Sequence, residues 1–402
     1  MKILIVNVGS TSLKFRLFDL EHGEAELAAG RLEGIGSGRC PFKMTAASGK
    51  AAEGVAEWAD YTAALESTIE FLRQGESAPL ASLEDLGGVG FKCVHGGARF
   101  TAAHLLTDEV LQAMEEATLL APVHNPPYLK AIRAVARLLP KTPLAALFEP
   151  AFHATIPEAA STYAVPYEWI ERYGIRKFGF HGASHRYIAE RLPQLLGRAA
   201  AGLRIISCHL GGSSSITAIR DGKSVDHSFG FTAQSGLLHG SRTGDLDAFV
   251  PLWLIERHGW KAGDVAMALA RDSGLKGLSG LGSEYRDVEA AAARGHRRAQ
   301  LAVDVFVHGV RHYIGAFVAA LGGLEALAFT GGIGERSVST RARICENLDW
   351  LGIRLDADRN RRAPAEGPIH AEDSRAQIWV VPTNEEIIVA RAAAEAIRSP
   401  RR

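Results

Sequence analysis

Residues 7–15, NVGSTSLKF, interrupt an apolar run near the start of the chain and decide how this part folds. Residues 3–6 are all aliphatic, and a glycine with three small hydroxyl residues soon follows. Hydrophobic residues then return at every second position, at Leu13, Phe15 and Leu17. A period of two is typical of a half-buried strand. The stretch therefore predicts a β-hairpin with a loop rich in glycine and hydroxyls.

A second stretch has the same layout much later in the chain. Residues 205–222, IISCHLGGSSSITAIRDG, again place an apolar run before glycines and small hydroxyls, then alternate and end in the turn signal Asp221-Gly222. Two copies of one unit predict a duplicated architecture of two similar domains, with a soft boundary near residue 150. We expect each glycine loop to face a shared cleft, where ligands usually bind.

A third glycine-rich loop lies in residues 325–340, EALAFTGGIGERSVST. Strand, glycine turn and helix start follow one another there, a layout that binds anions. Apolar residues at helical spacing predict helices over 60–73 and 104–119, one or two within 286–321, and a last one from about Glu385 to Ile397, after the short strand IWVVP. This mixture indicates α/β layers.

Composition excludes several classes of protein. The chain has 402 residues, 47% of them hydrophobic, and equal numbers of basic and acidic residues, 45 each, so no charge excess favours nucleic acid or an anionic membrane. Four cysteines lie far apart without a C-x-x-C, and no run of apolar residues is long enough to span a membrane. We expect a cytoplasmic protein with reduced thiols and a small-molecule ligand.

Three glycine loops together favour a nucleotide. Backbone amides freed by glycine, with hydroxyls such as Ser10 and Ser12, bind phosphate oxygens, and Lys14 would neutralise their charge. For any single loop the alternative is an ordinary tight hairpin whose hydroxyls bond their own backbone.

Several further residues carry possible chemistry, most of them with a plainer alternative. His181 lies between aromatic residues and a glycine, where it could donate to a developing negative charge or serve only in packing. Arg242, in a glycine-flanked turn, suits a moving phosphoryl group or a surface salt bridge. Glu149, Glu385 and Glu386 follow apolar strands and could hold magnesium, although Glu385 and Glu386 could equally complement a helix dipole. His95 and His124 lie in turns.

Together these stretches resemble the acetate kinase family over essentially the whole chain. Its motifs occur in order: N-x-G-S-x-S-x-K, V-H-G-G, A-F-H-x-T-I-P, F-G-F-H-G-x-S-H, H-L-G-x-x-S-S-I-T-A, G-x-R-x-G-x-x-D, F-T-G-G-I-G-E and T-N-E-E. The resemblance implies an α/β fold of the duplicated actin-like and sugar-kinase-like type, with domains at 1–150 plus the helix at about 385–402, and at 151–384. It implies a homodimeric kinase that makes acyl phosphate from a short carboxylate with ATP and Mg²⁺, reversibly.

The resemblance also implies roles for individual residues. Those implied near magnesium are Asn7 and Glu385, and those in catalysis are Lys14, His124, Glu149, His181 and Arg242. The acceptor would lie among Lys92, Val94, Val123, Phe180 and Ala233. The nucleotide would lie among Ser10, Ser12, Lys14, His209, Leu210, Gly211, Gly212, Ser213, Glu284, Tyr285, Arg286, Gly332, Ile333, Gly334, Glu335 and Arg336.

Several of these positions depart from the family pattern. Lys92 stands where the family has an arginine, and a lysine lacks the bidentate grip that an arginine has on a carboxylate. Glu149 replaces an aspartate. Gly212 and Arg336 replace asparagines, Glu284 an aspartate and Ala233 a proline. Three alternatives follow: another acceptor, such as propionate, butyrate or a functionalised acid, another phosphoryl donor, or a nucleotide-binding regulator without catalysis.

Overall fold

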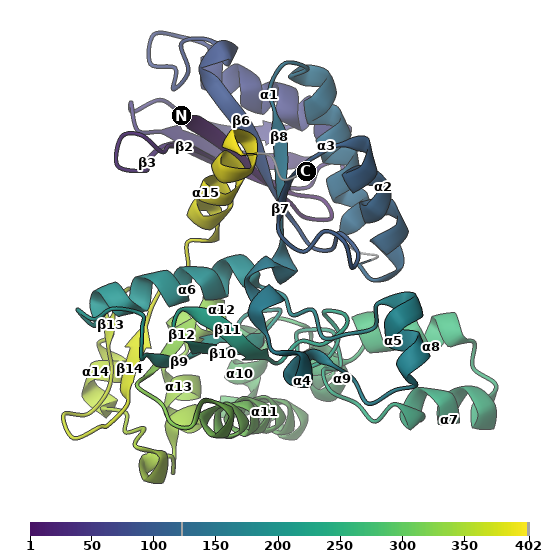
Figure 1. Cartoon of the computed structure of the whole chain (residues 1–402), viewed down its shortest axis with the longest axis vertical. Helices are drawn as coiled ribbons and strands as arrows, with labels where there is room; N and C mark the ends of the chain where they lie inside the picture. Colours follow the sequence, from purple (N-terminus) through teal and green to yellow (C-terminus); the bar gives the residue numbers. More distant parts are fainter. Residues whose placement is uncertain (122–123, 400–402) are drawn as a thin grey trace. The chain divides into compact units, whose positions relative to one another are not determined.

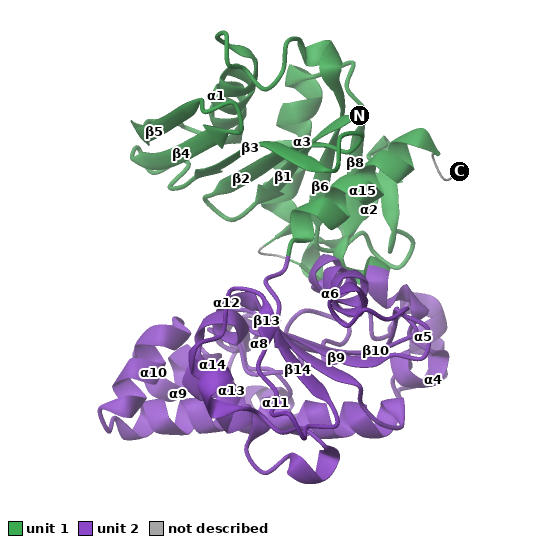
Figure 2. Ribbon diagram, turned by 90° about the vertical axis from the view of Figure 1, so that its left-hand side faces the viewer, with its two compact units in different colours: residues 1–151, 384–402 green, residues 152–383 purple. Residues whose placement is uncertain are grey.

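The computed structural model describes residues 1–121 and 124–399, and the chain forms two compact units. Unit 1 comprises Met1–Ala151 and Asn384–Arg402, and unit 2 comprises Phe152–Thr383 (Figure 2). The end of the chain therefore returns to the first unit.

The sheet of unit 1 has eight strands in the order β5-β4-β3-β2-β1-β6-β8-β7 (Figure 1). Their bounds are β1 Lys2–Val8, β2 Leu13–Asp19, β3 Ala25–Leu32, β4 Cys40–Ala46, β5 Ala51–Ala56, β6 Leu86–Cys93, β7 Ala103–Leu105 and β8 Leu144–Phe148. The predicted opening hairpin is confirmed as β1 and β2, which pair antiparallel with Asn7 opposite Lys14. Strands β6 and β8 run parallel to β1 and follow it in the sheet, so their carboxyl ends lie at one edge.

Helices cover this sheet and complete the core of unit 1. They are α1 Tyr61–Arg73, α2 Asp108–Glu116, α3 Asn125–Leu138 and α15 Glu385–Arg398, with short 3-10 helices at Leu83–Asp85, Ala117–Leu119 and Glu149–Thr155. Helix α15 packs on β6 and β8. The prediction of a helix over 104–119 is wrong at its start, because residues 103–105 pair with β8 and the helix begins only after the capping residue Thr107.

Unit 2 repeats the plan of unit 1. Its sheet order is β11-β10-β9-β12-β14-β13, from β9 Arg204–His209, β10 Ser215–Arg220, β11 Lys223–His227, β12 Ala326–Thr330, β13 Gly367–Pro368 and β14 Gln377–Val380. The run β11-β10-β9-β12-β14 has the same antiparallel and parallel pairings as β3-β2-β1-β6-β8. The duplicated actin-like α/β fold is therefore confirmed.

The helices of unit 2 are more numerous. They are α4 Glu158–Ser161, α5 Tyr167–Tyr173, α6 Gly182–Leu195, α7 Phe249–His258, α8 Ala262–Arg271, α9 Gly274–Ser279, α10 Tyr285–Ala293, α11 Arg297–Leu321, α12 Gly331–Arg336, α13 Val338–Cys345 and α14 Ala357–Arg361, with a 3-10 helix at Asp349–Leu351. Residues 286–321 thus fall in two helices, because Gly295 adopts a positive φ and His296 caps α11.

Helix α11 is, within the described residues, the one helix whose length and hydropathy would allow it to cross a membrane. It packs instead on the sheet of unit 2, where side chains such as Phe306, Val310 and Phe317 are buried in the core. The four cysteines are all free and buried, as expected of reduced thiols.

Candidate active site

The first glycine loop, residues 9–12, closes the β1–β2 hairpin with its hydroxyls turned outward. The Gly9 amide donates to the Ser12 carbonyl at 2.8 Å, which closes the turn. The hydroxyls of Ser10, Thr11 and Ser12 make no hydrogen bond within the described residues, so the alternative of local backbone bonding is wrong here. Lys14 is exposed on β2 and pairs with no carboxylate in the described part of the chain. This loop presents hydroxyls to solvent, and the adjoining strand β2 presents the ammonium group of Lys14.

Asn7, at the end of β1, is held by a neighbouring helix. The Tyr128 hydroxyl, on α3, donates to Asn7 Oδ1 at 2.8 Å and accepts from the Val8 amide at 3.2 Å. The Asn7 side chain is therefore oriented at the same edge of the sheet as the ends of β6 and β8.

Lys92, on β6, lies between two carboxylates that come from distant parts of the chain. Its Nζ bonds Glu385 Oε2, at the first turn of α15, and lies 3.3 Å from Glu149 Oε1, directly after β8. The side chains are 18%, 14% and 6% exposed, respectively. Burial disfavours the ammonium, but attraction to Glu385 and Glu149 outweighs it and holds the pKa of Lys92 well above its usual value. We call these residues the Lys92 triad.

The other predicted site residues of this region lie just after β6 or just before α3. Val94 is half-buried just after β6, and exposed His124 precedes α3, whereas Val123 lies outside the described residues. His95 is structural: it is buried, its Nδ1 accepts from the Gly97 amide at 2.9 Å, and burial lowers its pKa to about 4.

In unit 2 the second and third glycine loops are joined through Leu210. The Leu210 amide donates to the Thr330 carbonyl, and the Leu210 carbonyl accepts from the amides of Ile333 and Gly334 at 2.8 and 3.2 Å. The structure thus brings His209, Leu210 and Gly211 beside the predicted nucleotide residues of α12.

Three amides of the third loop, those of Gly331, Ile333 and Gly334, are used within the protein. Gly331 N donates to Glu335 Oε1 at 2.9 Å, and those of Ile333 and Gly334 are satisfied by Leu210. Gly331 needs its glycine because φ is 76° and a Cβ would lie 2.7 Å from the Leu210 carbonyl oxygen. The contribution of Gly331 is therefore close packing of two loops, and the anion-binding role of this turn stays a prediction. At Gly212, by contrast, an added Cβ meets nothing within 4 Å.

His181 caps the start of α6 in a left-handed conformation, with φ 57° and ψ 30°. Non-glycine residues hold this conformation at an energetic cost, and such residues are enriched at functional sites. His181 Nδ1 lies 2.9 Å from Ser215 Oγ, and its ring centroid lies 4.3 Å from that of His209. Phe180 is buried beside it, edge-on to Phe229.

Behind His181 lies a cluster of buried histidines that the sequence reasoning missed. Its members are His153, His185, His227 and His239, and each ring bonds a serine, a threonine or the backbone. Burial lowers the pKa of His153 to about 3 and holds the pKa of the other three well below the usual value. These four are neutral, whereas His181 and His209 are only partly buried. Spacing gave no signal, since the four rings come from four separate segments: the 3-10 helix Glu149–Thr155, α6, β11 and the loop between β11 and α7.

Arg242 has no carboxylate partner in the part of the chain that the structure describes. Its Nη1 donates to the Ala233 carbonyl, so these two predicted residues lie together. Burial lowers the pKa of Arg242 to about 10, and the guanidinium remains charged at neutral pH. The surface salt bridge alternative is therefore wrong, and a half-buried cation is left to attract an anion.

Residues 284–286 were predicted to lie at the nucleotide, but Tyr285 is packed inside the protein. Tyr285 is buried against Phe306, and its hydroxyl lies 2.6 Å from Thr340 Oγ1. Arg286 is largely exposed and contacts Asp287 at 3.4 Å, and Glu284, Arg336, Gly332 and Ser213 lie at or near the surface. Only the exposed members of this set can reach a ligand in this conformation.

The donor set of unit 1 fits a hard divalent cation. Asn7 offers an amide oxygen, and Glu149 and Glu385 offer carboxylate oxygens, the ligands that Mg²⁺ prefers. The three charges of the Lys92 triad sum to −1 at a site that water reaches poorly, which favours a further cation. In the described residues no group of three or more His, Cys, Asp or Glu forms a metal cage. A Mg²⁺ ion that keeps waters and phosphate oxygens needs no such cage.

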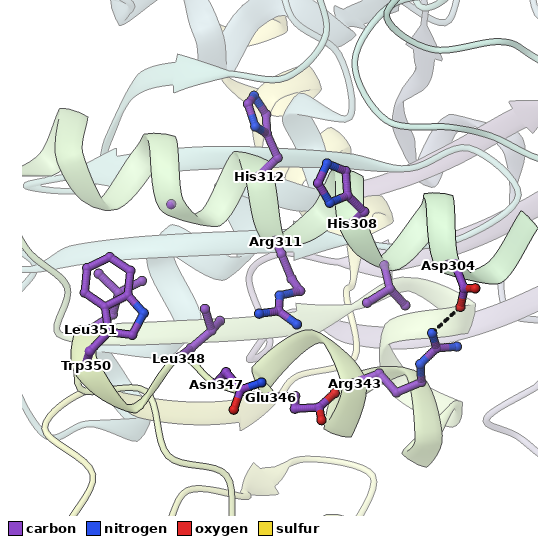
Figure 3. A pocket seen from close by; sticks show the side chains of 12 residues that line it. Asp304, His308, Arg311, His312, Arg343, Glu346, Asn347, Leu348, Trp350 and Leu351 are labelled. Atoms are coloured by element: carbon purple, nitrogen blue, oxygen red, sulfur yellow. Dashed lines mark hydrogen bonds and ion pairs between the residues drawn. The ribbon is translucent and has the colours of Figure 1, made fainter. Parts of the chain in front are cut away.

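A separate pocket of about 610 Å³ lies between α11 and α13 (Figure 3). Arg311, His308, His312 and Trp350 line it, but so do Glu346 and Asp304, and Asp304 pairs with Arg343. Its charges balance, and none of the predicted site residues lines it.

The chain was compared with known proteins. A model of the acetokinase family matches residues 2–391. An acetate kinase of Desulfitobacterium hafniense is 43% identical over 390 residues, covering 97% of this chain and 98% of that protein. The crystal structure of Porphyromonas gingivalis acetate kinase, 36% identical, covers 98% of both chains with a TM-score of 0.87. That of a propionate kinase from Francisella tularensis, 34% identical, covers 97% of this chain and 98% of its own with a TM-score of 0.88.

Proposed function

The chain belongs to the acetokinase family, and we propose that it phosphorylates acetate with Mg-ATP to give acetyl phosphate and ADP, reversibly. Membership makes it a phosphotransferase with a carboxyl group as acceptor, and implies use of ATP and ADP. One observation carries the residue assignment: a half-buried Arg242 with no carboxylate partner in the described chain, in the same unit as the two glycine loops joined at Leu210.

The reaction needs charge stabilisation more than proton transfer. An acceptor carboxylate oxygen forms a bond to the γ-phosphorus, the bond from that phosphorus to the β,γ-bridging oxygen breaks, and ADP leaves with that electron pair. The nucleophile is already ionised at neutral pH, so no general base is required. What remains is to orient the acceptor and to neutralise charge that spreads over the moving phosphoryl.

We assign this work to six cationic or donor groups. Arg242 and His181 would donate to the oxygens of the transferring phosphoryl, and exposed Lys14, with Ser10 and Ser12, would bind the nucleotide phosphates. Lys92 would orient the acceptor carboxylate, for which it must share its ammonium with Glu149 and Glu385. Asn7 and Glu385 would hold Mg²⁺, which supplies positive charge to the phosphates when bound.

The acceptor is tested by trapping acyl phosphate with hydroxylamine. Purified protein with Mg-ATP, and in parallel with Mg-GTP, is offered straight-chain acids of two to five carbons. We expect trapped product with acetate as the best substrate. Best turnover with propionate or butyrate would move the function to that acid, and product with GTP alone would change the donor. Nucleotide binding without product on any acid would support the regulator alternative and contradict the kinase assignment.

We also propose a homodimer, formed by apolar side chains on α7 and α8, two helices that pack against each other. Helix α7 has no buried residue, although its sequence is FVPLWLIERH. Exposed apolar side chains of α7, of α8 and of the turn between them are Phe249, Leu252, Trp253, Trp260 and Met267. Monomers rarely leave such a patch uncovered, and a second copy, as the family resemblance implies, would cover it.

Phe249 and Trp253 are 74% and 56% exposed. Replacing either residue by glutamate is expected to convert the dimer to monomer, because the substitution places a charge in an apolar interface. Light scattering after gel filtration measures this directly. The control is Leu119→Glu in unit 1, 91% exposed, which should leave the mass unchanged. A wild-type monomer, or variants that stay dimeric, would contradict the assignment of this patch.

A further inference from the structure

A chain of hydrogen bonds leads from the sheet of unit 2 to His181. His185 Nδ1 lies 2.9 Å from Ser207 Oγ, on β9, and His185 Nε2 lies 2.8 Å from Ser215 Oγ, on β10. Ser215 Oγ in turn lies 2.9 Å from His181 Nδ1. Ser207, His185 and Ser215 are fully buried, so water does not compete for these bonds.

The direction of each bond follows from Ser207. Within the described residues the Ser207 hydroxyl has His185 as its only side-chain or backbone partner. A buried hydroxyl that donated to nothing would leave its hydrogen unsatisfied, so Ser207 donates and His185 Nδ1 accepts. His185 is neutral, because burial holds its pKa well below the usual value. A neutral imidazole carries one N–H, which then must be at Nε2.

The same reasoning carries the direction to His181. His185 Nε2–H donates to Ser215 Oγ, and Ser215 has no partners besides these two histidine rings for its hydroxyl in the described chain. Its hydrogen is therefore donated to His181 Nδ1. We propose that Ser207, His185 and Ser215 form a relay that holds the His181 proton at Nε2, leaving that nitrogen as the donor toward the reacting phosphoryl. The catalytic part of this inference rests on the proposed function, whereas the proton position does not.

The relay gives its members the role of positioning residues. If the His181 proton were at Nδ1, it would meet a Ser215 oxygen that already accepts from His185, and the Ser215 hydrogen would lose its acceptor. The His209 ring beside His181 is engaged separately, with its Nδ1 2.8 Å from Ser184 Oγ. The left-handed backbone of His181 and the relay behind it thus constrain the ring from two sides.

The proton position is measured on protein labelled with ¹⁵N-histidine, from two-bond correlations between ring nitrogens and carbon-bound protons. We expect a single Nε2–H tautomer for both His181 and His185, with each Nδ1 accepting a hydrogen bond. In Ser215→Ala, the His181 Nδ1 should lose that signature and an Nδ1–H population should emerge. An Nδ1–H tautomer in the wild type, or no change in the variant, overturns the relay.

Kinetics provide the second readout. Ser215→Ala should lower kcat about tenfold to a hundredfold, less than full removal of an oxyanion donor, with little change in KM, and Ser215→Thr should restore it. The matched control is Ser224→Ala, because Ser224 is equally buried and bonds the structural ring of His153 at 3.0 Å. An equal loss of kcat in Ser224→Ala would overturn the catalytic part of the inference. An inactive wild type with the expected tautomers would defeat the proposed function and leave the relay standing.

Discussion

Replacing Arg242 by alanine is expected to lower kcat by about 10³-fold or more, the range measured when an arginine is removed from a phosphoryl-transfer site. The guanidinium is half-buried, charged and without a carboxylate partner in the described chain, so its charge is available to the moving phosphoryl. Nucleotide affinity should change little, because the assigned phosphate contacts of the ground state come from other residues. Steady-state kinetics and calorimetric titration with ADP separate the two quantities.

Two further variants sharpen this experiment. Arg242→Lys keeps the charge but loses the planar fork, so we expect intermediate activity. Arg220→Ala is the matched control, because Arg220 also donates to carbonyl oxygens, those of Ala320 and Leu321, but at the far end of β10. Equal losses of turnover and nucleotide affinity in Arg242→Ala would count against the assigned role.

Replacing Lys92 by methionine should destabilise the protein by about 3 to 5 kcal/mol, the usual effect of breaking a buried ion pair. The change leaves the carboxylates of Glu149 and Glu385 together at a poorly hydrated site without their shared cation. At about 2 to 4 °C per kcal/mol, Tm falls by roughly 10 °C. Thermal unfolding followed by circular dichroism measures the shift.

The cause of this loss is tested by removing the repulsion. Lys92→Met combined with Glu385→Gln should recover part of the stability, and millimolar Mg²⁺ should raise Tm more in Lys92→Met than in the wild type. The control is Lys177→Met, which breaks a single half-exposed pair with Asp226 and should cost less. A wild-type Tm for Lys92→Met, or no recovery in the double variant, would refute the triad as a unit.

Local patterns predicted the elements that define the fold. Alternation identified β1 with β2 and β9 with β10, and the turn at Asp221-Gly222 was recognised from its residue types. These features depend on residues close in sequence, so the chain itself contains their explanation. The prediction over 104–119 was wrong at its start because pairing of β7 with β8, distant in sequence, overrode helical spacing.

The predicted site residues stay a prediction, but tertiary contacts changed what several of them can do. Lys92 was expected to grip a substrate carboxylate, and in the folded chain it already bonds Glu385, 293 positions away. Tyr285 was expected at the nucleotide and is packed in the core. Neither outcome could be predicted, because residue type alone does not reveal which partner occupies a charge or ring.

Residue order and hydrophobic period were enough to indicate two hairpin-led α/β units and the classes of residue at their loops. The neutral histidine cluster, the relay to His181 and the Lys92 triad were decided only by the tertiary structure. Their members come from separate strands and helices that meet through parallel pairing such as β6 with β8 and β9 with β12. The charge of a lysine and the proton position of an imidazole depend on burial and on partners, and those exist only once the sheets have formed.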